Sequence, residues 1–227
     1  MTSLTAATER LLSTARALTA DDWAAPSLCT GWSRAHVLAH LALNADALAG
    51  VLRGIRDGRP VTMYASDDAR DGDIDVLAAE APAAVLDRLV AGSAALAEVV
   101  GVADGLAPGT LFERTPGGQQ MPADGVPGLR LREVEIHHAD LDAGYSAADW
   151  PPTTAIAFLG HDAARYDGPG FHVVATDEPA RWAFGSPAAN APTVSGPLDA
   201  LAWWATGRAP AAVLSSTTGT LPSLEGR

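Results

Sequence analysis

Apolar residues that recur every three or four positions constrain the fold of this chain more than any other feature. This helical periodicity covers five stretches before Tyr166: residues 4–19, Ser33 to about Asp57, and about 82–102, 128–144 and 152–166. Ser33 is expected to be the N-cap of the second helix. Helices of this length can bury such stripes against one another. The sequence therefore predicts a mainly α-helical fold built on a helical bundle.

The segments between and after these stretches differ in character. A polar, Asp-rich stretch at 64–75 is expected to be a loop, and residues 104–127 contain so many Gly and Pro residues that we expect mostly loop there. After Tyr166, Phe171–Thr176 and Arg181–Phe184 are typical of short strands, and about 197–206 is typical of a last helix. This tail is expected to form a small α+β part that packs on the bundle.

Composition limits the classes of function. Of the 227 residues, 48% are apolar, which permits a substantial core. The net charge of −12 provides no basic footprint for phosphate backbones and argues against nucleic acid as the main partner. We expect no membrane span, since no run approaches the roughly 18 apolar residues required. Residues 1–19 mix apolar with polar and charged residues and do not resemble a signal peptide, so the cytoplasm is the expected location.

Cys29 is the single cysteine, so neither an intramolecular disulfide nor a site with several cysteines can form. A lone cysteine is more often a small core or loop residue than a nucleophile, and we interpret Cys29 in that way. All 15 basic residues are arginines. Schiff-base chemistry on lysine is therefore excluded.

Four of the six histidines lie in two groups on expected helices, His36 with His40 and His137 with His138. Glu133 precedes His137 by four positions, so the two side chains share a helix face about one turn apart. Catalytic zinc sites commonly use three His, Asp or Glu ligands and leave one position open. One histidine of the first group with Glu133 and His137 would supply such a set. The spacing alone also suits surface ion pairs and core histidines.

Three motifs resemble the DinB-like, mycothiol-dependent maleylpyruvate isomerase family, in order along nearly the whole chain. They are Gly31–Leu41, Leu131–Tyr145, and Gly196-Pro197 followed by Leu201–Arg208. The resemblance implies an N-terminal four-helix bundle with a zinc site and a small α/β C-terminal domain. We therefore expect domains at residues 1–150 and 151–227.

The resemblance also implies the site residues. The implied metal ligands are His40, Glu133 and His137, and Arg208 matches an arginine that is important for catalysis in the family. Because the matching ligand is the second histidine of its helix, His36 is expected to be a packing residue or to lie just outside the ligands. His138 points about 100° away from His137 and is expected to be structural.

Two roles stay open at this stage. Asp140, one turn beyond His137, either orients that ligand or faces solvent. Arg208 either binds the substrate or is a helix C-terminal arginine that interacts with the helix dipole.

The implied activity is the cis–trans isomerisation of maleylpyruvate to fumarylpyruvate with zinc and mycothiol. Because Cys29 lies outside the motifs, the thiol must come from a small molecule. Two imidazoles and one carboxylate leave zinc with a net charge of about +1, which a thiolate would neutralise. Addition of the thiolate to the double bond of maleylpyruvate permits rotation, and its elimination gives the trans isomer. The substrate is a dianion, so Arg208 is the first choice for binding a carboxylate or stabilising the enolate.

Two alternatives remain open from the sequence. The same zinc and thiol would serve an S-transferase that acts on electrophilic compounds. A module that binds a small molecule without catalysis is the second alternative, with Trp203 and Trp204 lining an apolar pocket, although paired aromatic residues on a helix are more often core.

Overall fold

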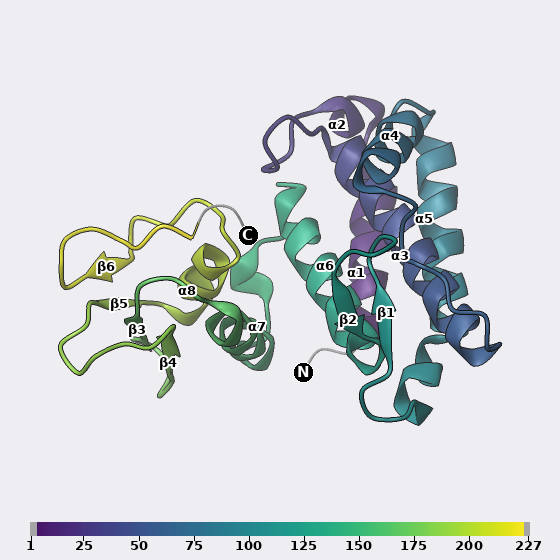
Figure 1. Ribbon diagram of the computed structural model, residues 1–227. Helices are drawn as coiled ribbons and strands as arrows, with labels where there is room; N and C mark the ends of the chain where they lie inside the picture. Colours follow the sequence, from purple (N-terminus) through teal and green to yellow (C-terminus); the bar gives the residue numbers. More distant parts are fainter. Residues whose placement is uncertain (1–3, 225–227) are drawn as a thin grey trace. The chain divides into compact units, whose positions relative to one another are not determined.

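The computed structural model describes residues 4–224 and is mainly helical, as predicted (Figure 1). Two compact units divide the described chain at Gly144 and Tyr145. The first unit contains the helices α1 (Leu4–Ala17), α2 (Ala20–Ala24), α3 (Arg34–Arg56), α4 (Asp67–Ala78), α5 (Pro82–Ala97) and α6 (Val126–Asp140), and the strands β1 (Leu111–Glu113) and β2 (Gln120–Pro122). The second contains α7 (Pro152–Arg165), β3 (Phe171–Ala175), β4 (Arg181–Phe184), β5 (Thr193–Gly196), α8 (Leu198–Ala205) and β6 (Ser215–Ser216).

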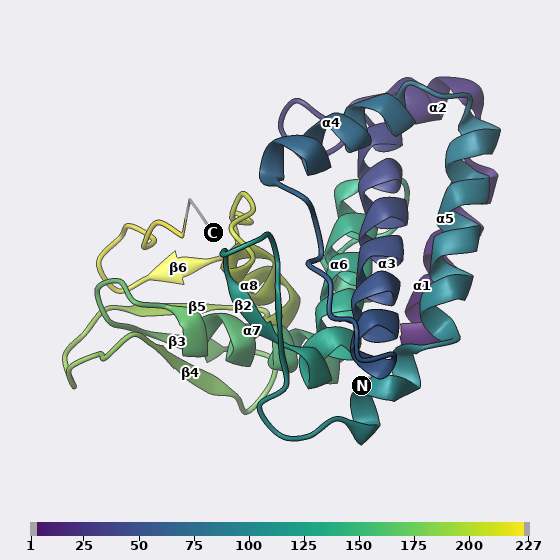
Figure 2. The same ribbon diagram turned by 45° about the vertical axis from the view of Figure 1, so that its right-hand side comes forward.

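Four helices of the first unit pack as a ring, in which α3 and α1 each contact both α5 and α6 (Figure 2). The central helix is α3, with 13 of its 23 residues buried. Its predicted N-cap is confirmed, because the Ser33 side chain accepts a hydrogen bond from the His36 N–H. The core between these helices is made by Leu11, Leu38, Leu41, Leu89 and Val134, among others. The predicted bundle therefore forms, and α3 and α6 face each other across its interior.

The prediction of a loop at 64–75 is wrong, because α4 begins at Asp67 within it. The Ser66 hydroxyl caps this helix by accepting a hydrogen bond from the Ala69 N–H. Asp67 and Asp68 in the first turn add a favourable interaction with the helix dipole. The apolar stripe of α4 is short, because Ile74 is buried and only Leu77 and Ala78 pack beside it, while the first half of the helix is mostly polar.

Other boundaries moved by a few residues. The third expected helix ends as α5 at Ala97, and a 3-10 helix at Val100–Gly105 follows it. The fourth begins and ends earlier than expected, since Asp142 and Gly144 take positive φ angles that stop α6. The segment at 104–127 contains the antiparallel pair β1–β2 within its loops.

In the second unit, a four-stranded sheet has the order β4-β3-β5-β6. Its β3 pairs antiparallel with β4 and parallel with β5, while β6 pairs antiparallel with β5. Both predicted strands are present, and β5 and β6 were not predicted. Helix α8 contacts α7, β3 and β5. Phe171 stacks on Phe184 and lies against the buried Trp204, so aromatic residues form the core here. Trp204 also lines a cavity of about 280 Å³, and Trp203 is half-buried.

Within the described residues, α3 is the one helix long and apolar enough to cross a membrane, by length and composition only. In this structure 72% of its apolar window is buried. A core helix of a globular protein passes the same test, so the finding is weak evidence for a membrane span.

Candidate metal centre

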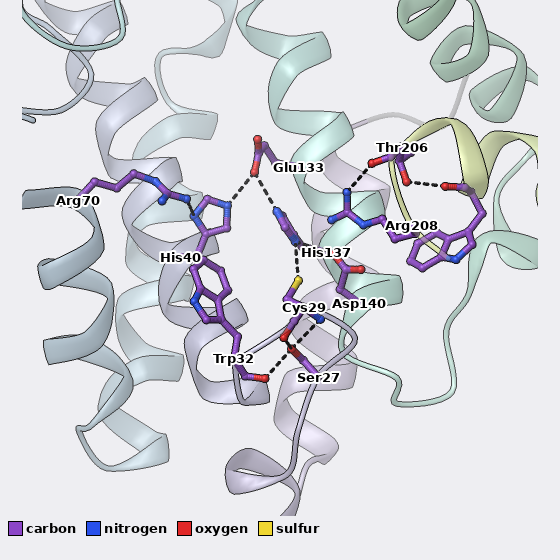
Figure 3. Close-up of polar contacts among 11 residues, drawn as sticks. Ser27, Cys29, Trp32, His40, Arg70, Glu133, His137, Asp140, Thr206 and Arg208 are labelled. Atoms are coloured by element: carbon purple, nitrogen blue, oxygen red, sulfur yellow. Dashed lines mark hydrogen bonds and ion pairs between the residues drawn. The ribbon is translucent and has the colours of Figure 1, made fainter. Parts of the chain in front are cut away.

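The three ligands implied by the sequence lie together between α3 and α6 (Figure 3). The His40 Nε2–H donates a hydrogen bond of 2.8 Å to Glu133 Oε2, and His137 Nε2 lies 3.4 Å from the same oxygen. The ring centroids of His40 and His137 are 4.8 Å apart. One ligand atom from each residue therefore falls within 4.8 Å of the other two.

The packing of the two helices explains this arrangement. Glu133 and His137 stack one turn apart on the face of α6 that meets α3. His40 lies in the buried middle of α3, where its side chain is 5% exposed. Glu133 keeps 35% of its side-chain surface exposed, so one part of the cluster stays accessible to a ligand.

The pKa shifts of this cluster favour metal-binding forms at His40 and Glu133. Burial lowers the pKa of His40 to about 4, although the hydrogen bond to Glu133 opposes this, so the imidazole is neutral. Burial acts to raise the pKa of Glu133, but the hydrogen bonds from His137 and His40 and the charge of His137 outweigh it and hold that pKa well below its usual value. A neutral imidazole and an ionised carboxylate are the forms that bind metals.

The donor set fits a zinc ion. Two imidazole nitrogens and one carboxylate oxygen converge from two helices, as in catalytic zinc sites with one open position. The Nε2 atoms of both imidazoles already face Glu133 Oε2.

Asp140 orients His137, which answers the question that the sequence left open. Its side chain is fully buried, and its Oδ2 accepts a 2.8 Å hydrogen bond from His137 Nδ1–H. Burial acts to lower the pKa of His137, but this bond, together with Cys29 and Glu133, raises it well above the usual value. The bond keeps a proton on Nδ1 and directs Nε2 to Glu133, which is the orientation a metal ligand needs. Because the raised pKa leaves a second proton on Nε2, a metal must displace that proton to bind there.

The other two histidines of α3 and α6 lie outside the cluster, as expected. His36 contacts the N-cap residue Ser33 and stacks on Trp32. His138 is buried, and its Nε2 forms a 2.8 Å hydrogen bond with the Thr14 hydroxyl. A structural role for both stays a prediction.

Cys29 contacts the site, which the sequence did not reveal. Its Sγ lies 3.9 Å from His137 Nδ1, because the Leu28 N–H donates a 2.8 Å hydrogen bond to the Asp140 carbonyl and brings the loop to the end of α6. The sulfur approaches the ring nitrogen that bonds Asp140, not the nitrogen that faces Glu133. No sequence pattern could show a contact that depends on one backbone bond between distant segments.

Arg70 on α4 was also missed, because its segment was assigned to a loop. Its Nη2 lies 3.2 Å from His40 Nδ1, and its guanidinium lies over the Tyr64 ring. Next to this contact is a cavity of about 200 Å³. The cavity is lined by His40, Leu43, Ala47, Met63, Tyr64, Ala65, Ala69, Arg70, Asp73 and Ile74.

Arg130 lies one turn before Glu133 on α6 and is 1% exposed. Its Nη1 donates a 2.7 Å hydrogen bond to Asn44 Oδ1, while Nη2 has no hydrogen-bond partner among residues 4–224. Burial lowers the pKa of Arg130 to about 10, which still leaves it positive at neutral pH. A buried cation thus accompanies the carboxylate of Glu133.

Arg208 belongs to the second unit and follows Gly207, whose φ of +83° ends α8. Its Nη1 donates a 3.0 Å hydrogen bond to the Thr206 carbonyl, and its guanidinium lies 5.8 Å from the Trp203 ring centroid (Figure 3). This residue also lines a cavity of about 280 Å³ within its own unit. Its catalytic role stays a prediction.

A ring of helices that brings two imidazoles and a carboxylate together defines a helical-bundle protein with a candidate metal centre. Residues 4–142 match the family described as the mycothiol maleylpyruvate isomerase N-terminal domain. The chain belongs to this family.

Solved structures show the same fold over nearly the whole chain. A crystal structure of the mycothiol-dependent maleylpyruvate isomerase superposes with a TM-score of 0.84, and a variant of it with one histidine replaced by alanine superposes with 0.83. Each is 24% identical in sequence, and each comparison covers 97% of this chain and 92% of the other. No curated protein matches the chain. At this identity the likeness supports the fold, and the activity must be argued from the site.

Proposed function

We propose that this protein is a zinc- and mycothiol-dependent enzyme that isomerises maleylpyruvate to fumarylpyruvate in the cytoplasm. The observation that carries the proposal is the convergence of His40, Glu133 and His137 between α3 and α6. Membership of the isomerase family supports the choice of thiol and substrate.

Each site residue has a defined task in this proposal. His40, Glu133 and His137 would hold the metal, and Asp140 accepts a hydrogen bond from His137 Nδ1–H, so that Nε2 is the nitrogen that faces Glu133. When bound, zinc would supply Lewis-acid stabilisation that keeps a small thiol ionised at neutral pH. Arg130 is a buried positive charge behind Glu133, and it favours the approach of anions to the cluster.

The reaction returns the thiol unchanged. The thiolate forms a carbon–sulfur bond at the cis double bond, and the displaced electron pair moves onto the conjugated carbonyl as an enolate. The former double bond is now single and rotates. The enolate then re-forms the double bond in the trans geometry and expels the thiolate.

Arg208 is the residue proposed to bind a carboxylate of the substrate or the oxygen of the enolate. A guanidinium can form two parallel hydrogen bonds with a carboxylate or stabilise an enolate oxygen. Arg208→Lys should lower turnover by about 30- to 1,000-fold, which corresponds to a loss of about 2 to 4 kcal/mol. Zinc content and melting temperature should stay unchanged. Near-normal turnover in both Arg208→Lys and Arg208→Ala would remove Arg208 from the site and leave it as a partner of the helix dipole.

The direct test combines metal analysis with turnover. Purified protein should contain about one zinc ion per chain, and isomerisation should require an added small thiol. Cys29→Ser should keep activity, because its sulfur faces the Nδ1 side of His137 and not the cluster. Isomerisation in thiol-free buffer would contradict the proposal. Transfer of the thiol to electrophiles without isomerisation would identify an S-transferase instead.

A further inference from the structure

The two imidazoles of the cluster have opposite partners on their outer nitrogens. His137 Nδ1 faces a carboxylate, that of Asp140, at 2.8 Å. His40 Nδ1 faces a guanidinium, that of Arg70, at 3.2 Å. Metal-ligating histidines normally donate their second N–H to an acceptor. His137 follows this rule, and His40 does not.

The contact between Arg70 and His40 fixes the tautomer of that imidazole. An arginine can only donate, so Nδ1 must be the acceptor. The ring proton of the neutral imidazole is then on Nε2, where it is donated to Glu133 Oε2. A metal bound at Nε2 requires this proton to lie on Nδ1 instead, where it would point at another donor. The Arg70 contact and a metal at His40 Nε2 therefore exclude each other.

The surroundings allow Arg70 to leave. It lies on α4, where Ile74 is the buried residue, and its side chain is 19% exposed. The same side chain lines the cavity of about 200 Å³ beside His40. A rotation of this flexible side chain would turn the guanidinium into the cavity without moving α3 or α6.

We propose that Arg70 leaves His40 when a metal binds and then holds a carboxylate of the substrate in this cavity. The inference rests on the proposed metal centre and adds a second anion-binding residue to it. The Tyr64 ring, 5.8 Å from the guanidinium carbon, keeps the side chain against the cavity wall.

The first test measures zinc affinity in Arg70 variants by competition with a chelator of known affinity. Arg70→Gln should bind zinc about tenfold more tightly than the wild type, because its amide oxygen can accept from Nδ1–H. Arg70→Glu should bind still more tightly. The matched control is Arg56→Ala, which also removes an arginine paired with the next aspartate, roughly 24 Å along α3 from His40.

The second test reads the tautomer directly by long-range nitrogen–proton NMR of the histidine rings. In chelator-treated wild type the His40 proton should be on Nε2, and with zinc it should be on Nδ1. A proton that moves between the two nitrogens shows that Arg70 opposes the metal through its hydrogen bond to Nδ1. Charge repulsion between the arginine and the metal would not require the proton to move. A proton on Nδ1 under both conditions would overturn the proposal.

The third test uses maleate, a cis-dicarboxylate, as the probe for the cavity. The zinc-loaded wild type should bind maleate at least about tenfold more tightly than Arg70→Gln, and Arg70→Glu should be weakest. Zinc and maleate affinities thus change in opposite directions, which a structural role would not produce. If the wild type binds no zinc, both the proposed function and this inference fail. If it binds zinc but Arg70→Gln behaves like Arg56→Ala, only the inference fails.

Discussion

Helices α6 and α4 both place a charged side chain against His40, but they are held in the molecule very differently. Nine residues of α6 are buried, including three charged ones, Arg130, Glu135 and Asp140. On α4 the buried residue is Ile74, and the helix packs on α3. A helix with so little buried surface opens or shifts at low cost in free energy. The metal ligands thus lie on the rigid helix, and the arginine that opposes metal binding lies on the adjustable one.

The largest expected effect on zinc affinity comes from a ligand on the rigid helix α6. Glu133→Gln removes the anionic ligand that both imidazoles face. Zinc affinity should fall by more than about 100-fold. This is a larger loss than the roughly 10- to 100-fold expected when a residue that hydrogen-bonds a ligand is changed. Metal content of the purified variant, measured by mass spectrometry, checks this.

His36→Ala is the control for that experiment, since His36 lies one turn from His40 on the same helix but outside the cluster. It should retain the metal, whereas His40→Ala and His137→Ala should lose it. The reverse result within the pair His36 and His40 would show that the wrong histidine was assigned.

A smaller effect on zinc affinity is expected for Asp140, which lies on α6 and hydrogen-bonds the ligand His137. Asp140→Asn keeps the size of the side chain but removes the charge that fixes the His137 tautomer. Zinc affinity should fall by about 10- to 100-fold. Because Arg70→Gln on α4 should change zinc affinity in the opposite direction, the two variants measured together sharpen the contrast between the helices. Equal losses in both would mean that α4 and α6 support the metal in the same way.

The sequence was sufficient where a residue's role follows from its own helix. Two such local features are the i, i+4 spacing of Glu133 and His137 and the capping serine of α3. In the structure Glu133 contacts His137 on α6, and Ser33 caps α3. The resemblance supplied His40, and the structure brings it to the other two. That these residues bind a metal stays a prediction.

The sequence failed where burial is slight or contacts are distant. Helix α4 is capped by Ser66 and buries Ile74, so periodicity could not reveal it, and Arg70 was missed with it. The strand β5 is short, and proline residues flank it on both sides, which obscured it. Cys29 reaches His137 through a backbone bond between Leu28 and Asp140, which leaves no trace in spacing.

The smallest expected effect compares the same change at the start of two helices. Ser66→Ala and Ser33→Ala each remove an N-cap hydroxyl, which is worth about 1 kcal/mol. On α3, where 13 residues are buried, the helix cannot open alone, so the loss should appear as lower global stability in urea. On α4 the loss should appear locally: amide hydrogen exchange in Asp67–Ala78 should become about fivefold faster, while the urea midpoint barely moves.

If α4 is the adjustable element, Ser66→Ala should also affect zinc binding. Easier opening of α4 weakens the hold of Arg70 on His40, so zinc affinity should rise slightly, by less than in Arg70→Gln. Ser33→Ala should produce no such gain, because Ser33 caps α3, the helix that carries His40, and leaves α4 and Arg70 unchanged. Equal exchange rates in α4 for both variants would show that α4 unfolds only with the bundle, and the distinction between a rigid and an adjustable helix would be lost.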